Sequence, residues 1–271
     1  MSQQERWQLG GNAPEIYERH LVPAIFRPWA PIVVELGRLQ PGERVLDVAC
    51  GTGIVARVAA KHVGSSGRVV GLDINPEMLT IARSLPPAPG AVVEWREAGV
   101  DAMPFPDAAF DVVFCQLGLQ YFPDRPAALR EMRRVLVTRG RLALMVWRPI
   151  QFSPGFAMLA EALEHRVSIE AASVMRAPFS LGEVGSLRVL IEGGGFHSVN
   201  IRPATGTVRF PSLEDFVRHQ VAGSPLAGHV VKVDDQARAA LLSDVKEALR
   251  PYTAADGLKF PIEALLAVAY A

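Results

Sequence analysis

The sequence predicts an α/β protein with a mostly parallel sheet that is covered by helices on both faces. Short apolar runs alternate with helical patterns over residues 44–147 of the 271, which is typical of strand–helix–strand units. The run FDVVFC at 110–115 is apolar almost without a break, as expected for a strand that is buried on both faces. A glycine-rich turn follows the first strand, at the edge where open α/β sheets bind ligands.

The first half of the chain is expected to hold five strands and three helices. The strands are predicted at 44–49, 68–73, 91–97, 110–115 and 141–147. Helices are predicted from about 54 to 62, after Asn75-Pro76, and over 126–137, because apolar residues recur there at helical spacing. A proline in the first turn is itself a helix-start signal.

The pattern becomes more helical after Trp147. Helices are predicted over 151–173, 180–196, 212–222 and 234–249, the second ending at a glycine cluster and the third capped by Ser212. A sixth strand is expected at 197–203, with a shorter extended piece at 206–210. Residues 262–270 are interpreted as the last strand, since Pro261 disfavours a helix there.

Composition excludes several classes of protein. The 28 basic and 28 acidic side chains give zero net charge, so nothing attracts the whole molecule to nucleic acid or to an anionic membrane. Two cysteines cannot form a disulfide framework or, at their spacing, a metal site. No apolar run approaches the roughly 20 residues of a membrane span, and the polar N-terminus lacks a signal core. We therefore expect a cytoplasmic protein without metal.

The most informative stretch is VLDVACGTGIVA at 45–56. Gly51 and Gly53 allow a tight turn whose backbone N–H groups approach a ligand closely, and with Ala56 they also satisfy the dinucleotide fingerprint. Asp73 ends the second strand about 20 residues later, where a carboxylate accepts hydrogen bonds from ribose hydroxyls. These features suit NAD and S-adenosylmethionine equally.

Asp47 separates the two cofactors. It lies just before the turn, where a carboxylate repels a pyrophosphate but attracts an ammonium group. The alternative is that Asp47 only accepts hydrogen bonds from the amides of the turn, because buried carboxylates are usually paired.

The ordered motifs VLDVACGTG, VVGLDINPEML, the segment 102–136 and RGRLALMVW resemble the class I S-adenosylmethionine-dependent methyltransferases. The likeness is greatest to the ubiquinone/menaquinone-biosynthesis type of small-molecule methyltransferase. It is strong over about residues 40–150 and looser over the N-terminal helix and 187–199. The resemblance implies a Rossmann-like seven-stranded, mostly parallel sheet with helices on both faces, an antiparallel last strand and helical lid elements.

The resemblance also implies a site and a domain plan. Its motifs place the following residues at the cofactor S-adenosylmethionine and its product S-adenosylhomocysteine: Tyr17, Asp47, Ala49, Cys50, Gly51, Gly53, Asp73, Ile74, Met78, Gly99, Val100, Gln116 and Leu117. We expect one domain, 1–271. Its cofactor core covers about 35–150, 181–203 and 258–271, with an N-terminal cap at 1–34 and lid insertions at 151–180 and 212–250.

Two departures from the family pattern matter. Ala49 stands where the family usually has its first glycine. The usual aspartate after the third strand is replaced by Gly99, so the adenine amino group would be bound by a backbone group near Val100, or by Asp101 from a shifted loop.

The methyl acceptor is expected above the carboxyl ends of the strands, beside His20, Gln120 and Tyr121. Apolar residues of the cap and the insertions either roof this pocket or are ordinary core: Phe26, Trp29, Phe152, Phe156, Met158, Phe179, Phe216 and Val217. No catalytic base is assigned, because in-line methyl transfer depends on alignment and desolvation.

The predicted function is S-adenosylmethionine-dependent methyl transfer to a small, hydrophobic organic acceptor, through O-, C- or N-methylation. The alternatives are a protein of this fold that uses the cofactor without methyl transfer, and an NAD-dependent oxidoreductase. No nucleic-acid partner or membrane insertion is expected, and a homodimer is left open.

Overall fold

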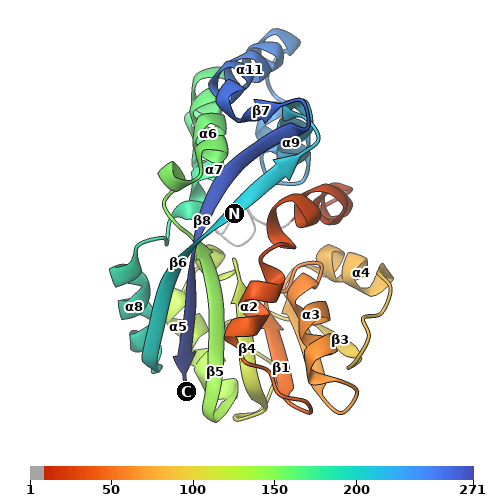
Figure 1. Cartoon of the computed structure of the whole chain (residues 1–271), viewed down its shortest axis with the longest axis vertical. Helices are drawn as coiled ribbons and strands as arrows, with labels where there is room; N and C mark the ends of the chain where they lie inside the picture. Colours follow the sequence, from red (N-terminus) through yellow and green to blue (C-terminus); the bar gives the residue numbers. More distant parts are fainter. Residues whose placement is uncertain (1–8) are drawn as a thin grey trace.

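The computed structural model describes residues 9–271. Its centre is one mixed sheet with the strand order β3-β2-β1-β4-β5-β8-β6, whose strands lie side by side across Figure 1. The strands are β1 Arg44–Val48, β2 Arg68–Asp73, β3 Val93–Glu97, β4 Phe110–Gln116, β5 Leu136–Trp147, β6 His197–Phe210, β7 Thr253–Ala254 and β8 Gly257–Tyr270. β1 to β5 pair in parallel, and β8 runs antiparallel to both β5 and β6.

Helices cover both faces of this sheet. They are α1 Ala13–Ile16, the π-helix η2 Tyr17–Phe26, α2 Ala30–Leu36, α3 Ile54–Val63, α4 Pro76–Ser84, η3 Leu119–Tyr121, α5 Arg125–Val135, η4 Ile150–Phe152, α6 Pro154–Arg166, α7 Ile169–Arg176, η5 Ala177–Phe179, α8 Val184–Gly193, α9 Leu213–Ala222, α10 Ala227–Val230, α11 Asp235–Ala248 and η6 Arg250–Tyr252. Successive residues of β1 point to opposite faces, so Val45 joins the core beneath α2 and α3, whereas Leu46 joins the core beneath α5 and α8.

The predicted fold class is confirmed, with one difference in the strand count. The additional strand is β7, a two-residue piece that pairs with β8. The extended pieces predicted at 197–203 and 206–210 are a single strand, β6, and β5 begins at Leu136 rather than at residue 141.

The last strand begins at Gly257, five residues earlier than predicted, and it includes Pro261. β5 pairs with β8 only from Ala264 onward, so Pro261 has β6 as its strand neighbour on one side alone. A proline is tolerated where its missing N–H faces the open side of a strand. For this reason Pro261 does not delay the strand.

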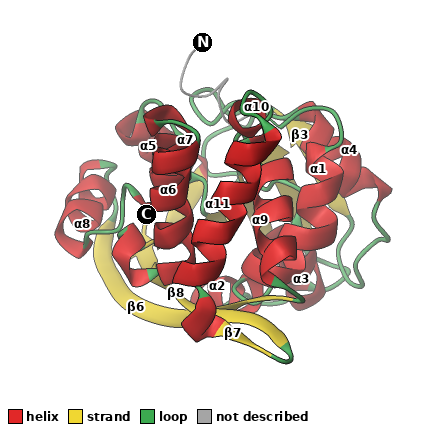
Figure 2. Cartoon of the chain, turned by 90° about the horizontal axis from the view of Figure 1, so that it is seen from above, coloured by secondary structure: helices red, strands yellow, loops and turns green. Residues whose placement is uncertain are grey.

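β6 and β8 continue together beyond the end of β5 and carry the helical lid (Figure 1). Viewed from above, α6, α9 and α11 lie next to one another over the sheet (Figure 2). The predicted Ser212 cap of α9 is present, with Ser212 Oγ accepting from Asp215 N at 2.9 Å.

The cap element that precedes the sheet is a wide-turned helix. In η2 the backbone N–H of Arg27 donates to Val22 O, five residues earlier, at 2.7 Å. Pro23 has no N–H to donate, and a π-turn is one way to accommodate the interruption. Residues 1–8 of the cap predicted at 1–34 lie outside the described part of the chain.

Candidate active site

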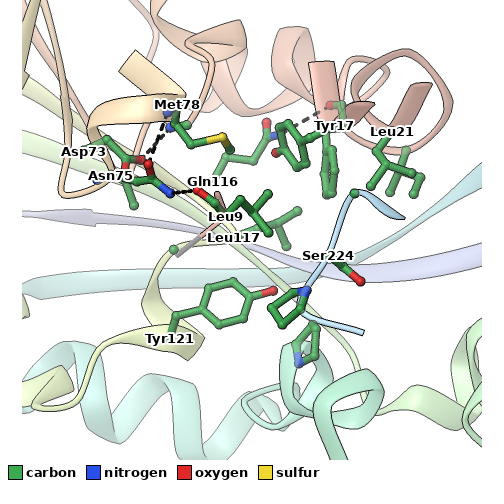
Figure 3. Close-up of a pocket in the computed structure, with 18 of the residues that line it drawn as sticks. Leu9, Tyr17, Leu21, Asp73, Asn75, Met78, Gln116, Leu117, Tyr121 and Ser224 are labelled. Atoms are coloured by element: carbon green, nitrogen blue, oxygen red, sulfur yellow. Dashed lines mark hydrogen bonds between the residues drawn. The ribbon is translucent and has the colours of Figure 1, made fainter. Parts of the chain in front are cut away.

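A cavity of about 250 Å³ opens where the carboxyl ends of β1 and β4 meet. The strand order reverses between these two strands, and this switch point is where open α/β sheets leave a crevice. Figure 3 shows Asp73, Asn75 and Met78 at one end of the cavity and Ser224 at the other, with Tyr17 and Gln116 between them. The two ends differ in chemistry.

Asp73 organises the polar end. Its Oδ2 accepts from Gly51 N at 2.7 Å and its Oδ1 accepts from Asn75 N at 2.9 Å. The side chain is 9% exposed, and burial raises its pKa against the opposing effect of these backbone N–H groups. Each carboxylate oxygen has a second lone pair, so both remain able to accept from a ligand hydroxyl.

Asp47 lies one strand away and is almost fully buried, at 1% exposure. Its Oδ2 accepts from Ala56 N at 2.9 Å, and burial raises the pKa of Asp47 to about 8. Asp47 is thus paired, as the alternative expected, but with an amide in the first turn of α3 and not with the glycine turn itself. The same residue also lines the cavity, so pairing with α3 does not remove it from the site.

The two glycines of the turn, Gly51 and Gly53, have different structural roles. Gly51 has φ +54°, and a Cβ there would lie 3.4 Å from Met78 Cε and 3.9 Å from Tyr17 Oη, in the space that the cavity occupies. Gly53 has φ +85°, and a Cβ there would overlap the Trp95 ring. Gly51 keeps the cavity open, whereas Gly53 makes room for Trp95.

Ala49 adopts a conformation that usually belongs to glycine. Its φ is +54°, in the left-handed region that costs a non-glycine residue about 1 kcal/mol or more. Ala49 lines the cavity, and its Cβ is the atom nearest to a Cβ built on Gly118. The departure from the family pattern at this position thus retains the backbone shape of a glycine turn.

Gln116 ends β4 and lies between the two ends of the cavity (Figure 3). Its Nε2 donates to Phe26 O at 3.3 Å, and its buried Oε1 has no hydrogen-bond partner among the described residues. Phe26 in turn stacks on Tyr17 with ring centroids 5.0 Å apart. The π-helix of the cap is thereby joined to the end of the sheet.

Ten of the thirteen residues expected at the cofactor line this cavity, and three do not. Gly53 lies against Trp95, and Gly99 and Val100 are in the loop after β3, outside the lining. The Asp101 carboxyl lies over Gly99. Binding of the adenine amino group by a backbone group near Val100, or by Asp101, therefore stays a prediction.

Only one of the three residues expected at the methyl acceptor lies in the cavity lining. Tyr121 lines the cavity, whereas His20 and Gln120 do not. His20 stacks on His219 of the lid, with ring centroids 3.6 Å apart. Gln120 is buried in η3, at 1% exposure. Neighbouring residues of η3 therefore differ, because Tyr121 lines the cavity and Gln120 does not.

The far end of the cavity is apolar and comes from the lid. Of the residues that could roof the pocket, Phe26, Phe156 and Phe179 line it. Trp29, Phe216 and Val217 are buried without lining it, and Phe152 lies under the Arg148 guanidinium.

Sequence reasoning missed further lining residues. They are Leu9, Leu21, Ile25, Ile54, Val55, Asn75, Gly118, Phe122, Trp147, Val174, Met175, Pro178, Gln220, Gly223, Ser224, Pro225 and Leu226. Only Asn75 carried a usable signal, the Asn-Pro start of α4. Its Oδ1 accepts from Glu77 N at 2.9 Å while its Nδ2 donates to Leu9 O at 2.9 Å.

Comparison with known proteins gives the family. Residues 46–144 match the family model of a methyltransferase domain. The chain is 32% identical over 197 residues to the ubiquinone/menaquinone biosynthesis C-methyltransferase UbiE of Cronobacter sakazakii, covering 68% of this chain and 78% of that protein. This chain belongs to the class I S-adenosylmethionine-dependent methyltransferases, close to the UbiE type.

A second relative and a solved structure are also similar to this chain. The 2-phytyl-1,4-naphtoquinone methyltransferase of Synechococcus elongatus is 35% identical over 152 residues, 55% of this chain and 64% of that protein. Several curated relatives are matched over only about half to two thirds of their own length. A solved S-adenosylmethionine-dependent methyltransferase from Aquifex aeolicus shares the fold, with a TM-score of 0.52 and 20% identity over 72% of this chain and 93% of that chain.

The polar end of the cavity fits the cofactor of this family. Asp73 retains lone pairs for two ribose hydroxyls, and Gly51 leaves open the space that a Cβ would fill. Two buried carboxyl groups, Asp47 and Asp73, suit a ligand that carries a sulfonium and an ammonium. Within residues 9–271, no group of three His, Cys, Asp or Glu side chains could hold a metal ion, and no helix is long and apolar enough to cross a membrane.

Proposed function

We propose that this protein transfers a methyl group from S-adenosylmethionine to a small apolar ring compound of the quinone type. The observation that carries the proposal is the division of one cavity into a polar end at the strand edges and an apolar end under the lid. The relatives' names support the class of acceptor, since one refers to a naphthoquinone and another to ubiquinone and menaquinone. The whole chain, 1–271, would act as one unit, because both ends of the cavity are needed.

When bound, the cofactor would supply an electrophilic methyl group. Asp73 would hold its ribose, and Asp47 would lie near its amino-acid part. Gln116 and Leu117, at the end of β4, would lie between cofactor and acceptor. The lid residues Phe156 and Phe179 would exclude water and pack on the acceptor ring, which strengthens electrostatic interactions inside the site.

The described lining contains no histidine, lysine, arginine or glutamate. Its titratable members are Tyr17, Asp47, Cys50, Asp73 and Tyr121, and burial raises the pKa of each of them. The cavity therefore favours catalysis by alignment and desolvation over catalysis by a charged general base.

Methyl transfer to reduced naphthoquinones and benzoquinones tests the proposal directly. Purified protein is incubated with radiolabelled S-adenosylmethionine and an acceptor panel, and the product is identified by mass. We expect labelled product from at least one apolar hydroquinone. Tight cofactor binding without product across the panel would favour the alternative, use of the cofactor without methyl transfer.

A further inference from the structure

Gln220 is a buried polar side chain at the apolar end of the cavity. It is 8% exposed and lines the cavity, and its Oε1 has no hydrogen-bond partner among the described residues. A buried amide oxygen without a partner has lost its hydration and gained no hydrogen bond in exchange, which is unfavourable. The residue lies outside the matched methyltransferase domain, 46–144, so the cofactor motifs do not explain it.

The position of Gln220 follows from helix α9. It lies one turn after Phe216, on the same face, and the Phe216 ring is 5.6 Å from the ring of Phe156, which lines the cavity. One turn later Ser224 Oγ donates to Gln220 O at 2.6 Å. Ser224 lies across the cavity from Asp73 and Asn75 (Figure 3). Gln220 is therefore on the lid side of the cavity, away from the Asp73 carboxylate.

A second unpartnered amide oxygen comes from the sheet side of the cavity. Gln116 Nε2 donates to a backbone carbonyl, Phe26 O, which fixes the orientation of the amide, since a carbonyl accepts only from nitrogen. Its Oε1 is consequently left as an acceptor without a donor. Two side-chain oxygens of the cavity lining, one on the lid and one at the end of β4, thus have no N–H or O–H donor among the described residues.

We propose that Gln220 is a specificity-determining residue whose amide oxygen accepts a hydrogen bond from a hydroxyl group of the methyl acceptor. Gln116 offers a second acceptor oxygen from the opposite wall. The inference rests on the proposed function for the identity of the ligand. It adds that the lid selects apolar ring compounds by a donated O–H, and that it rejects analogues of the same shape that lack one.

Equilibrium dialysis of the full chain with three ring probes tests this selection. 2-Naphthol carries an O–H, 2-methoxynaphthalene keeps the oxygen without the donor, and naphthalene has neither. With S-adenosylhomocysteine present, we expect the wild type to prefer 2-naphthol over the methyl ether by about tenfold. Gln220→Met, of nearly equal length but without an amide, is expected to reduce that preference to about twofold or less.

The matched control is Gln236→Met, the same chemical change on the exposed surface of α11, which is expected to keep the wild-type preference. Gln220→Asn keeps the amide but withdraws it by one methylene, so it is expected to lose the preference as well, even if the methionine variant does not fold. S-adenosylhomocysteine affinity is expected to stay within about twofold of wild type in every folded variant.

Three outcomes would overturn the inference. They are a wild type that binds 2-methoxynaphthalene as tightly as 2-naphthol, a wild type that does not bind 2-naphthol, and a Gln220→Met protein that keeps the full preference. Loss of S-adenosylhomocysteine binding by the wild type would instead contradict the proposed function. The preference for 2-naphthol is also measured without S-adenosylhomocysteine. Failure of this inference can therefore be told apart from failure of the proposed function.

Discussion

The two ends of the cavity are built in different ways. The polar end consists mainly of strand ends and tight turns within residues 47–78: Asp73 accepts from Gly51 N and Asn75 N, and Asn75 caps its own helix. The apolar end joins Leu21 and Phe26 of the cap to Phe156, Phe179 and Leu226, up to about 200 positions apart. Local geometry defines the cofactor end, and long-range packing defines the acceptor end.

Removing the Asp73 carboxyl is expected to have the largest effect. Asp73→Ala deletes the group that would hold the ribose and the turn, so S-adenosylhomocysteine should bind at least about 100-fold more weakly by calorimetry. Phe179→Ala, at the apolar end, should change the same affinity by less than about threefold. Equal losses in the two folded variants would show that the ends are not separate, and circular dichroism checks folding in each.

A substitution at Gly53 tests whether this glycine of the turn is needed for ligand binding or for stability of the fold. A Cβ at this position would overlap Trp95, and φ is +85°, so Gly53→Ala should lower the free energy of unfolding by about 2–3 kcal/mol. Trp95→Val in the same chain should recover part of that loss, measured as a coupling in a double-mutant cycle of urea unfolding. Additive losses would contradict the packing role and leave only the backbone strain.

The sequence signals of the polar end are local. The left-handed turn at Gly51, the carboxylate at Asp73 and the Asn75 cap each follow from a few adjacent residues. Gly53 lies in the same motif, but a glycine is needed there because the Trp95 ring packs against it. This tertiary contact between the start of α3 and β3 is not visible in any local sequence pattern. Gln220 was missed for the same reason, since one buried glutamine on an amphipathic helix resembles a surface residue in sequence. Strand ends were misplaced where pairing decided them, as at Pro261.

Asp47 links the polar end to pH. Burial raises its pKa to about 8 from 3.8, so the folded protein keeps a proton that the unfolded chain releases above about pH 4. The contribution of this group to stability therefore decreases as pH rises from about 4 to 8. Asp47→Asn should match the wild-type melting temperature near pH 4 and exceed it by at least about 3 °C at pH 8.

The control for this series is Asp235→Asn, an exposed aspartate on α11, whose melting curves should follow the wild type at every pH. A wild type that gains stability over Asp47→Asn between pH 5 and 8 would mean that Asp47 is ionised and paired in the folded protein. The polar end would then be preformed as an anion, contrary to the buried acid described above.

The smallest effect is expected where the lid meets the cap, at the stacked rings of His20 and His219. Burial lowers the pKa of His219, helped by His20 and Arg218 and opposed by Asp215. Below about pH 6.5 the unfolded chain takes up a proton that the folded protein resists, so this contribution to stability is lost as pH falls.

His219→Phe keeps a flat ring against His20 without titrating. Its melting temperature relative to wild type should rise by about 1–2 °C between pH 8 and pH 5, whereas His62→Phe, on the exposed side of α3, should show no such trend. The opposite slope would mean that His219 is held protonated by Asp215, and that the lid is tied to the cap by charge instead of by packing.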